Sequence, residues 1–135
     1  MPKGPLPTSV RELLEAPNMA VLATVGPDGA PQATVLWYVM EGDRVLVNSK
    51  LGRTKPANLD RDPRVALAVF DMASPYRSVQ LRGKVSERRE GEVAAADIHL
   101  LSRRYTGHDY GEPKARVSYL ITVESWSTWG LEEGS

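Results

Sequence analysis

The 135-residue sequence contains no cysteine, which excludes disulfide bonds and thiol chemistry from its folding and function. No apolar run approaches the ~18 residues that a membrane-spanning helix needs, and the first residues, MPKGPLPTS, lack the apolar core of a secretory signal. These absences predict a protein of the cytoplasm with no membrane span.

Neither sign of charge is in excess, because 17 lysines and arginines balance 17 aspartates and glutamates. Binding to nucleic acid in the presence of salt requires a strongly basic face, so we expect no nucleic-acid partner. The length suits one domain, which at this size buries roughly two thirds of the unfolded surface. We therefore predict a single cofactor-binding domain over residues 1–135, with a flexible N-terminus of about 1–7 and a C-terminal tail of about 125–135.

Familiar catalytic and metal-binding patterns are also missing. The sequence has no Ser/His/Asp set, no motif with paired carboxylates, no histidine cluster with metal-ligand spacing and no GxGxxG loop. The two histidines, His99 and His108, are expected to be structural or superficial and receive no role. Hydrolysis and metal chemistry thus lose support, no metal site is predicted, and the catalytic residues stay unassigned. An enzyme is still expected if a redox cofactor carries out the chemical step.

What the sequence does contain is a series of strand-forming segments rich in β-branched and aromatic residues. Six are expected: Met19–Gly26, Pro31–Met40, Arg44–Asn48, Arg64–Phe70, Arg77–Ser86 and Ala115–Glu124. Helices are expected over Thr8–Ala16, with Ser9 and Glu12 as a capping box, over Thr54–Asp60, with Thr54 as N-cap, and within Glu87–Tyr105. The pattern predicts a mainly β protein, a sheet or barrel with flanking helices.

The second expected strand has two distinct faces, because successive side chains of a strand point to opposite sides. One face is predicted to belong to the core and comprises Ala33, Val35, Trp37 and Val39. The other mixes polar and apolar groups, Gln32, Thr34, Leu36 and Tyr38. That second face suits either a solvated surface or one wall of a ligand cleft.

A basic loop follows the third expected strand. Between Lys50 and Arg64 there are five basic and two acidic residues, a local net charge of five minus two, or +3. Hydroxyl groups, a glycine, a guanidinium and an ammonium precede a helix N-terminus here, which is the chemistry of a phosphate site. By composition alone, however, the favoured interpretation is a solvated loop between a strand and a helix.

Three stretches, in this order, resemble a known family: SVRELLEAPNMAVLATVGPDGAPQATVLWYV, VLVNSKLGRTKPANLDRDPRVALAVFD and PYRSVQLRGKV. They are similar to the pyridoxamine 5′-phosphate oxidase-like split-barrel superfamily, and within it to the F420-dependent (deazaflavin) oxidoreductases. The resemblance implies a six-stranded antiparallel split β-barrel of the FMN-binding type. It also implies a homodimer with one cofactor in each of two grooves at the subunit interface.

The resemblance further implies roles for particular residues. The cofactor phosphate would be held by Ser49, Arg53, Thr54 and Lys55, the ring system would be lined by Gln32, Thr34 and Leu36, and Arg77 would approach from the partner subunit. The implied activity is hydride transfer between coenzyme F420 and a small unsaturated organic substrate. Two alternatives stay open: an FMN-binding oxidase or reductase of the same superfamily, and a non-catalytic protein that binds flavin or haem.

Several aromatic residues have two interpretations. Tyr38, Tyr76 or a tail tryptophan could shape the substrate side of the cofactor, but Tyr38 also suits a place in the core. Trp126 and Trp129 are too large and apolar to be left in water, so the tail is expected to pack on its own domain or on a partner subunit.

Overall fold

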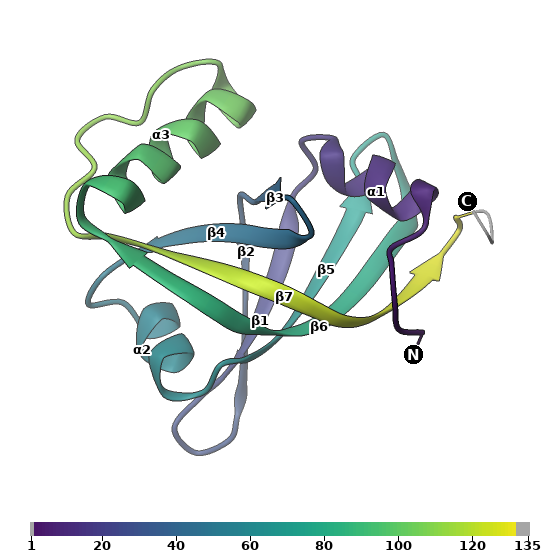
Figure 1. Ribbon diagram of the computed structural model, residues 1–135, viewed down its shortest axis with the longest axis horizontal. Helices are drawn as coiled ribbons and strands as arrows, with labels where there is room; N and C mark the ends of the chain where they lie inside the picture. Colours follow the sequence, from purple (N-terminus) through teal and green to yellow (C-terminus); the bar gives the residue numbers. More distant parts are fainter. Residues whose placement is uncertain (1, 132–135) are drawn as a thin grey trace.

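The computed structural model describes residues 2–131, which form seven strands and three helices (Figure 1). In chain order the elements are α1 (Thr8–Glu15), β1 (Ala20–Val25), β2 (Pro31–Leu36), β3 (Val39–Glu41), β4 (Arg44–Lys50), α2 (Thr54–Arg61), β5 (Arg64–Asp71), β6 (Ser74–Glu90), α3 (Gly91–Thr106) and β7 (Arg116–Trp129). Within these residues, no helix is both long and apolar enough to cross a bilayer.

The strands form one antiparallel sheet with the order β2-β1-β5-β6-β7-β4-β3. Its two edge strands, β2 and β3, are consecutive in the chain and are separated only by Trp37 and Tyr38. The sheet therefore curls until its edges approach, and a seam is left where the strands on the two sides are not paired. This is the predicted mainly β split barrel, confirmed in class and type.

The strand count differs from the six predicted, because the segment Pro31–Met40 divides into two strands. β2 pairs with β1, whereas β3 pairs with β4 on the other side of the seam. Tyr38 lies at the break, is fully buried, and donates its hydroxyl to the carbonyls of Leu14 at 2.9 Å and Ala16 at 3.2 Å. Its core interpretation is thus confirmed, and burial raises the pKa of its hydroxyl well above the usual range.

The predicted core face of β2 was wrong. Leu36 is buried and Gln32 and Thr34 are half-buried, while Ala33 is exposed and 65% of Val35 is accessible. Side chains do alternate between the two faces of β2, but the face that meets the core is the opposite of the predicted one. The outer surface of the barrel is apolar here as well. Sequence patterning cannot tell the two faces apart when both carry apolar side chains.

The three helices differ slightly from expectation at their ends. The N-cap of α1 is Pro7 and that of α2 is Arg53, and neither makes a side-chain cap hydrogen bond, so the predicted caps Ser9 and Thr54 were wrong. The region Glu87–Tyr105 is divided between the end of β6, which continues to Glu90, and α3. The helix within it is confirmed.

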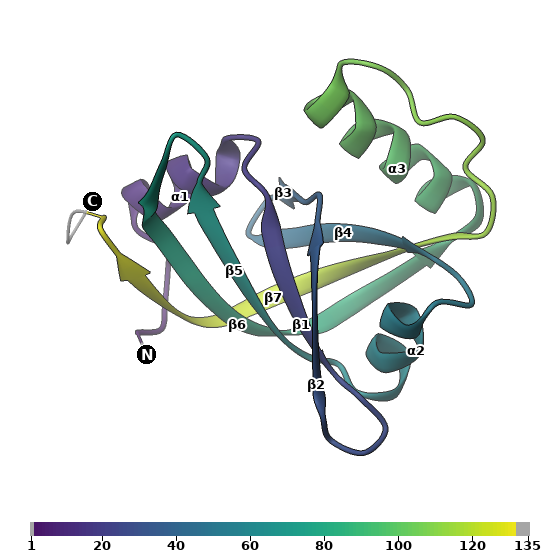
Figure 2. The ribbon, with the colours of Figure 1, turned by 180° about the vertical axis from the view of Figure 1, so that it is seen from behind.

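The two longest strands, β6 and β7, are coiled around each other and extend beyond the barrel (Figure 1). The segment predicted as a C-terminal tail starts inside β7, which runs to Trp129. Trp126 packs against the core, whereas 71% of Trp129 is exposed. The last four residues, 132–135, lie outside the described part of the chain. The segment that precedes α1 and the end of β7 lie on the same side of the molecule in the two ribbon views (Figures 1 and 2), and the amide of Trp126 donates to the carbonyl of Pro2.

The side chain of Arg104 links helix α3 to the end of helix α1 and to Tyr38. The guanidinium of Arg104, on α3, donates to the carbonyls of Leu14, Glu15 and Ala16 at the C-terminus of α1, over distances of 2.8 to 3.2 Å. It also donates to the carbonyl of Tyr38 at 3.0 Å. The carbonyls of Leu14 and Ala16 also accept from the Tyr38 hydroxyl, so Arg104 adds a further donor to them and supplies a donor to the Glu15 carbonyl at the end of α1.

Candidate functional site

A hollow of about 450 Å³ lies at the seam of the barrel, between edge strand β2 and the turn that joins β4 to α2. Seven residues line it: Gln32, Thr34, Ser49, Gly52, Arg53, Thr54 and Lys55. Six of the eight predicted cofactor-binding residues are thus brought together by the fold. Two of the six lie on β2, which pairs with β1. The other four lie on the β4–α2 segment, and β4 pairs with β3 and β7.

The turn places the N-terminus of α2 at this hollow. Gly52 has a φ of +91°, a left-handed conformation that glycine adopts without strain. The chain then enters α2 through Arg53, and no side chain caps the first turn. The amide groups of Thr54 and Lys55 therefore stay available at the positive end of the helix dipole, an arrangement that favours a bound anion.

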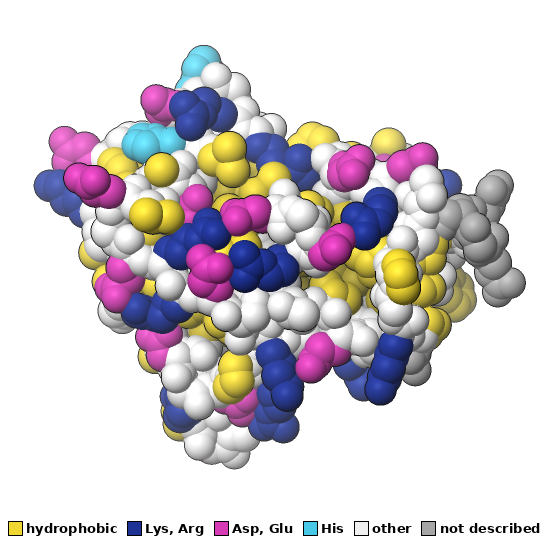
Figure 3. Space-filling model, in the orientation of Figure 1, with side chains coloured by type: hydrophobic (Ala, Val, Ile, Leu, Met, Phe, Trp, Pro, Cys, Tyr) yellow, Lys and Arg dark blue, Asp and Glu magenta, His cyan; other side chains and the backbone are white. Residues whose placement is uncertain are grey.

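The hollow carries concentrated positive charge. Lys55 is half-buried, and its pKa is lowered, first by burial and then by the nearby guanidinium groups of Arg116 and Arg53. Within residues 2–131, none of these three cations forms a salt bridge. By contrast, on the face drawn in Figure 3 basic and acidic side chains are interspersed. Cations that lie close together without a counter-charge make this hollow a candidate site for an anion.

Arg116 was missed in the sequence analysis. It lies on β7 directly opposite Lys50 of β4, and its guanidinium lies over the ring of Tyr110, 5.1 Å from the ring centre. Burial is also the main cause that lowers the pKa of Arg116. No sequence signal places a residue of the last strand beside this turn, because that proximity is created by strand pairing.

Buried hydrogen bonds hold Arg116 in place. Its Nε donates to Oδ1 of Asn48 at 2.8 Å, and Nδ2 of Asn48 donates to the Ser118 hydroxyl at 2.8 Å and to the Ala94 carbonyl at 3.0 Å. Ser118 in turn donates to Asp97 at 2.8 Å. These hydrogen bonds fix the orientation of the Arg116 guanidinium through its Nε.

The two remaining predicted residues lie away from the hollow. Leu36 is 8% exposed and belongs to the hydrophobic core cluster. Arg77 lies at the start of β6, where its Nε is 3.4 Å from Asp71, and it does not line the hollow of its own chain. Its predicted approach from a partner subunit therefore stays a prediction. Tyr76 is 80% exposed beside it.

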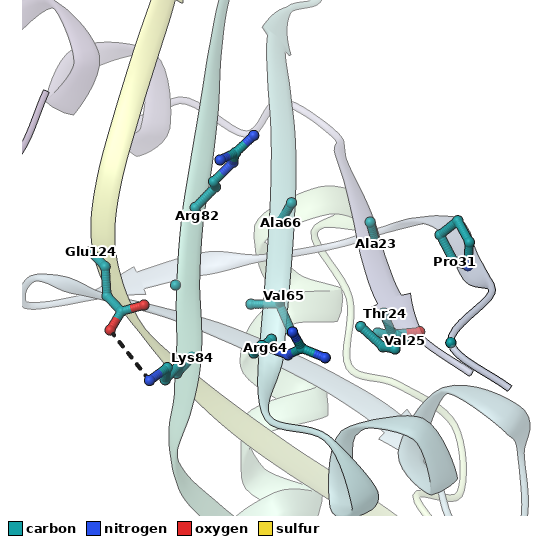
Figure 4. Close-up of a pocket in the computed structure, with 12 residues that line it drawn as sticks. Ala23, Thr24, Val25, Pro31, Arg64, Val65, Ala66, Arg82, Lys84 and Glu124 are labelled. Carbon is teal, nitrogen blue, oxygen red and sulfur yellow. Dashed lines mark ion pairs between the residues drawn. The ribbon is translucent and has the colours of Figure 1, made fainter. Parts of the chain in front are cut away.

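Two further hollows lie on the outer surface of the sheet. The one in Figure 4, of about 510 Å³, is lined mainly by residues of β1, β5 and β6, with Pro31 of β2 and Glu124 of β7, and Lys84 is paired with Glu124 at 4.0 Å. The other, of about 550 Å³, lies between β5, β6 and the end of β7 and includes Trp129. Neither includes Arg53 or Lys55, which line the seam hollow, so the seam is the anion-binding candidate.

The described residues contain no group of three or more His, Asp or Glu side chains that could hold a metal ion. His99 lies on α3 and His108 in the following turn, and neither lines the seam hollow.

Residues 6–130 match the Pyridoxamine 5′-phosphate oxidase family model. The chain belongs to this family. It is 33% identical over 89 residues to the Pyridoxine/pyridoxamine 5′-phosphate oxidase of Kineococcus radiotolerans. That match covers 66% of this chain but only 38% of the relative, so the chain corresponds to part of that longer protein.

Solved structures extend the likeness to nearly the whole family domain. An F420 Reductase superposes with a TM-score of 0.79 at 30% identity, over 94% of this chain and 98% of that one. A conserved hypothetical protein of Mycobacterium tuberculosis superposes with a TM-score of 0.77 at 26% identity, over 94% and 86% of the two chains.

Proposed function

We propose that this family member binds coenzyme F420 in the seam hollow and acts as an oxidoreductase on a small unsaturated organic substrate. The observation that carries the proposal is the meeting of Arg53, Lys55 and the uncapped N-terminus of α2 at one hollow. Cations without salt bridges and free backbone amides together match a phosphate group in charge and in hydrogen bonding.

The comparisons support the same class of activity. The solved structure with 30% identity is an F420 Reductase, and the matching part of the Kineococcus radiotolerans protein belongs to an oxidase. Because a fold is shared by many activities, the argument for this chain rests on its own residues at the seam.

When bound, a reduced deazaflavin would supply the hydride for reduction of an unsaturated acceptor, with a proton from water. The residues of the chain have the tasks of binding and orientation. Arg53, Lys55 and the hydroxyls of Ser49 and Thr54 would hold the phosphate, while the half-buried side chains Gln32 and Thr34 would form the wall beside the ring.

The extra cation Arg116 favours F420 over FMN. FMN ends in a single phosphate, whereas F420 continues from its phosphate into an acidic tail of lactate and glutamate units. Lys50 and Arg116 face each other across β4 and β7, immediately beside the turn that grips the phosphate. We place the acidic tail along these two side chains, where its carboxylates would be attracted.

Titration of the purified protein with F420 and with FMN, followed by fluorescence, tests this function. We expect both to bind and F420 to bind about tenfold more tightly, since an additional charge-assisted contact contributes roughly 1.5–3 kcal/mol. Reduced F420 should then be oxidised when unsaturated acceptors such as enones or quinones are added. Tighter binding of FMN would instead favour the FMN-dependent alternative, and binding of neither cofactor would refute the proposal.

The outer face of the sheet supports the proposed homodimer. Val35 of β2, Val21 of β1 and Ala68 of β5 lie side by side in register, and Ala33, Ala23 and Ala66 form a second such row. A monomer normally turns polar groups outward from a sheet of this kind. An apolar surface across three strands is therefore suited to burial against a second copy.

A charge at the centre of this face should prevent the association. We expect the wild type to have the mass of a dimer in light scattering, and Val35→Lys to have the mass of a monomer, because a buried, unpaired ammonium is strongly unfavourable. Val93→Lys is the matched control, since Val93 is also a valine and is 54% exposed, but lies on α3. A monomeric wild type, or a Val35→Lys variant that remains dimeric, would refute the dimer proposal.

A further inference from the structure

A buried polar group connects α2 to the β2 wall of the seam hollow. Asn58, on the inner side of α2, is only 2% exposed. Its Nδ2 donates to the Thr24 hydroxyl at 3.1 Å and to Oε1 of Gln32 at 3.1 Å. Its Oδ1 accepts a hydrogen bond of 2.9 Å from Arg61, whose same terminal nitrogen also donates to the Val25 carbonyl at 2.8 Å.

The direction of every bond in this group follows from Arg61. A guanidinium can only donate, so the oxygen of the Asn58 amide must face it and the nitrogen must face the other way. Both protons of that nitrogen are then used, one by Thr24 and one by Gln32. Thr24 cannot set the direction, because a hydroxyl both donates and accepts.

Gln32 consequently has one allowed orientation. Its Oε1 faces Asn58, and its Nε2, which has no hydrogen-bond partner in residues 2–131, is left for the hollow that Gln32 lines. The reversed orientation would place two N–H groups against each other, next to Thr24, which is 3% exposed. A buried mismatch of this kind is costly because water cannot enter to relieve it.

We infer that Arg61 and Asn58 set the polarity of Gln32, so that the β2 wall presents a hydrogen-bond donor and selects ligands whose ring edge carries acceptors. Carbonyl oxygens and unprotonated ring nitrogens are such acceptors, and a ring edge that carries amino groups is rejected. Asn58 and Arg61 act here as positioning residues through Gln32. The inference rests on the proposed function in so far as the ligand ring lies along β2.

The substitution Asn58→Asp tests the inference, because it changes the direction of the bonds while the shape stays almost the same. One carboxylate oxygen still accepts from Arg61, and the other now requires a donor from Gln32. The Gln32 amide should therefore rotate by half a turn and present its carbonyl to the hollow. We expect about tenfold weaker binding of F420 and of FMN, and unchanged competition by inorganic phosphate, which has no ring.

Two further variants separate this effect from a general disturbance. Ala57→Asp adds the same charge at an exposed position of α2 and should leave F420 affinity unchanged. In a Gln32→Leu background, Asn58→Asp should no longer alter the affinity, since the group that it reorients is gone. An equal loss in both backgrounds would overturn the inference.

A ligand-free measurement keeps the inference distinct from the proposed cofactor. In nuclear magnetic resonance of the protein alone, the Gln32 side-chain amide protons should exchange rapidly with water in the wild type and slowly in Asn58→Asp. Slow exchange in the wild type, unchanged by the substitution, would refute the inference even if F420 binds. Failure of the wild type to bind F420 or FMN, with the predicted exchange pattern present, would instead refute the proposed function alone.

Discussion

Replacing Arg53 and Lys55 together with alanine is expected to weaken the binding of F420 or FMN at least about 100-fold. Each side chain contributes a charge-assisted hydrogen bond of roughly 1.5–3 kcal/mol, and every ~1.4 kcal/mol corresponds to a tenfold change in affinity. The two cations line the same hollow and lie near enough to lower the pKa of Lys55. Both side chains should therefore contact the same bound anion.

The double variant should fold normally, because it removes repulsion rather than attraction. Its melting temperature should equal or exceed that of the wild type, which separates a binding defect from a folding defect. Arg11→Ala combined with Arg103→Ala is the matched control: it removes two positive charges that are exposed and paired with Asp43 and Asp109. Affinity in the control should stay within about twofold of the wild type if exposed pairs of this kind contribute little.

The pH of the titration matters because of Lys55. Burial and the neighbouring guanidinium groups lower its pKa, and a bound phosphate would raise it again. The affinity for the cofactor should therefore be highest at pH values below the pKa of Lys55 in the free protein, and it should fall as the pH rises through that pKa. The comparison is best made near neutral pH, where the ammonium is retained. If the double variant bound the cofactor as tightly as the Arg11→Ala/Arg103→Ala control, the assignment of Arg53 and Lys55 to a phosphate would be refuted.

Replacing Arg104 with alanine is expected to lower the free energy of unfolding by about 3 kcal/mol, since charged hydrogen bonds are worth roughly 1.5–3 kcal/mol each and are not fully additive. The guanidinium donates to four carbonyls, among them those of Leu14 and Ala16 at the end of α1. It also lies over the rings of Tyr38 and Tyr105, 5.3 and 5.4 Å from their centres. Without it, the Glu15 carbonyl loses its Arg104 donor, and the carbonyls of Leu14 and Ala16 lose one of several donors.

Urea denaturation of Arg104→Ala and Arg103→Ala provides the comparison. Arg103 is the neighbouring arginine on α3, but its pair with Asp109, at 3.2 Å, is more than half exposed on both sides. Its loss should cost less than about 1 kcal/mol. Arg104→Lys should be intermediate, because one ammonium cannot reach all the carbonyls that a planar guanidinium spans. Equal stability of the two alanine variants would show that Arg104 is not a structural link.

The contiguous part of the site was open to prediction from the sequence. Ser49, Arg53, Thr54 and Lys55 lie within seven residues of one another, so a turn before a helix suffices to bring them together. The end of the strand, the glycine of the turn and the start of the helix are all local features, governed by backbone conformation. Their resemblance to a family motif then pointed to a phosphate.

The parts that depend on distant pairing were not open to prediction. Arg116 joins the site only because β7 pairs with β4, and the outward direction of Val35 follows from the register between β1 and β2. The division of Pro31–Met40 into two strands likewise depends on the burial of Tyr38 beneath α1. Period-two alternation predicts that faces differ, not which face meets the core.

The sequence by itself determined the class of fold, the family and the turn that leads into α2, because each rests on local conformational preferences or on a contiguous motif. Only the tertiary structure decided that Gln32 and Thr34 share a hollow with that turn, that Arg116 adds a third cation, and that Asn58 sets the direction of the Gln32 amide. The physical reason is that hydrogen-bond direction and charge proximity depend on side-chain placement in space, which is set by strand pairing and closure of the barrel.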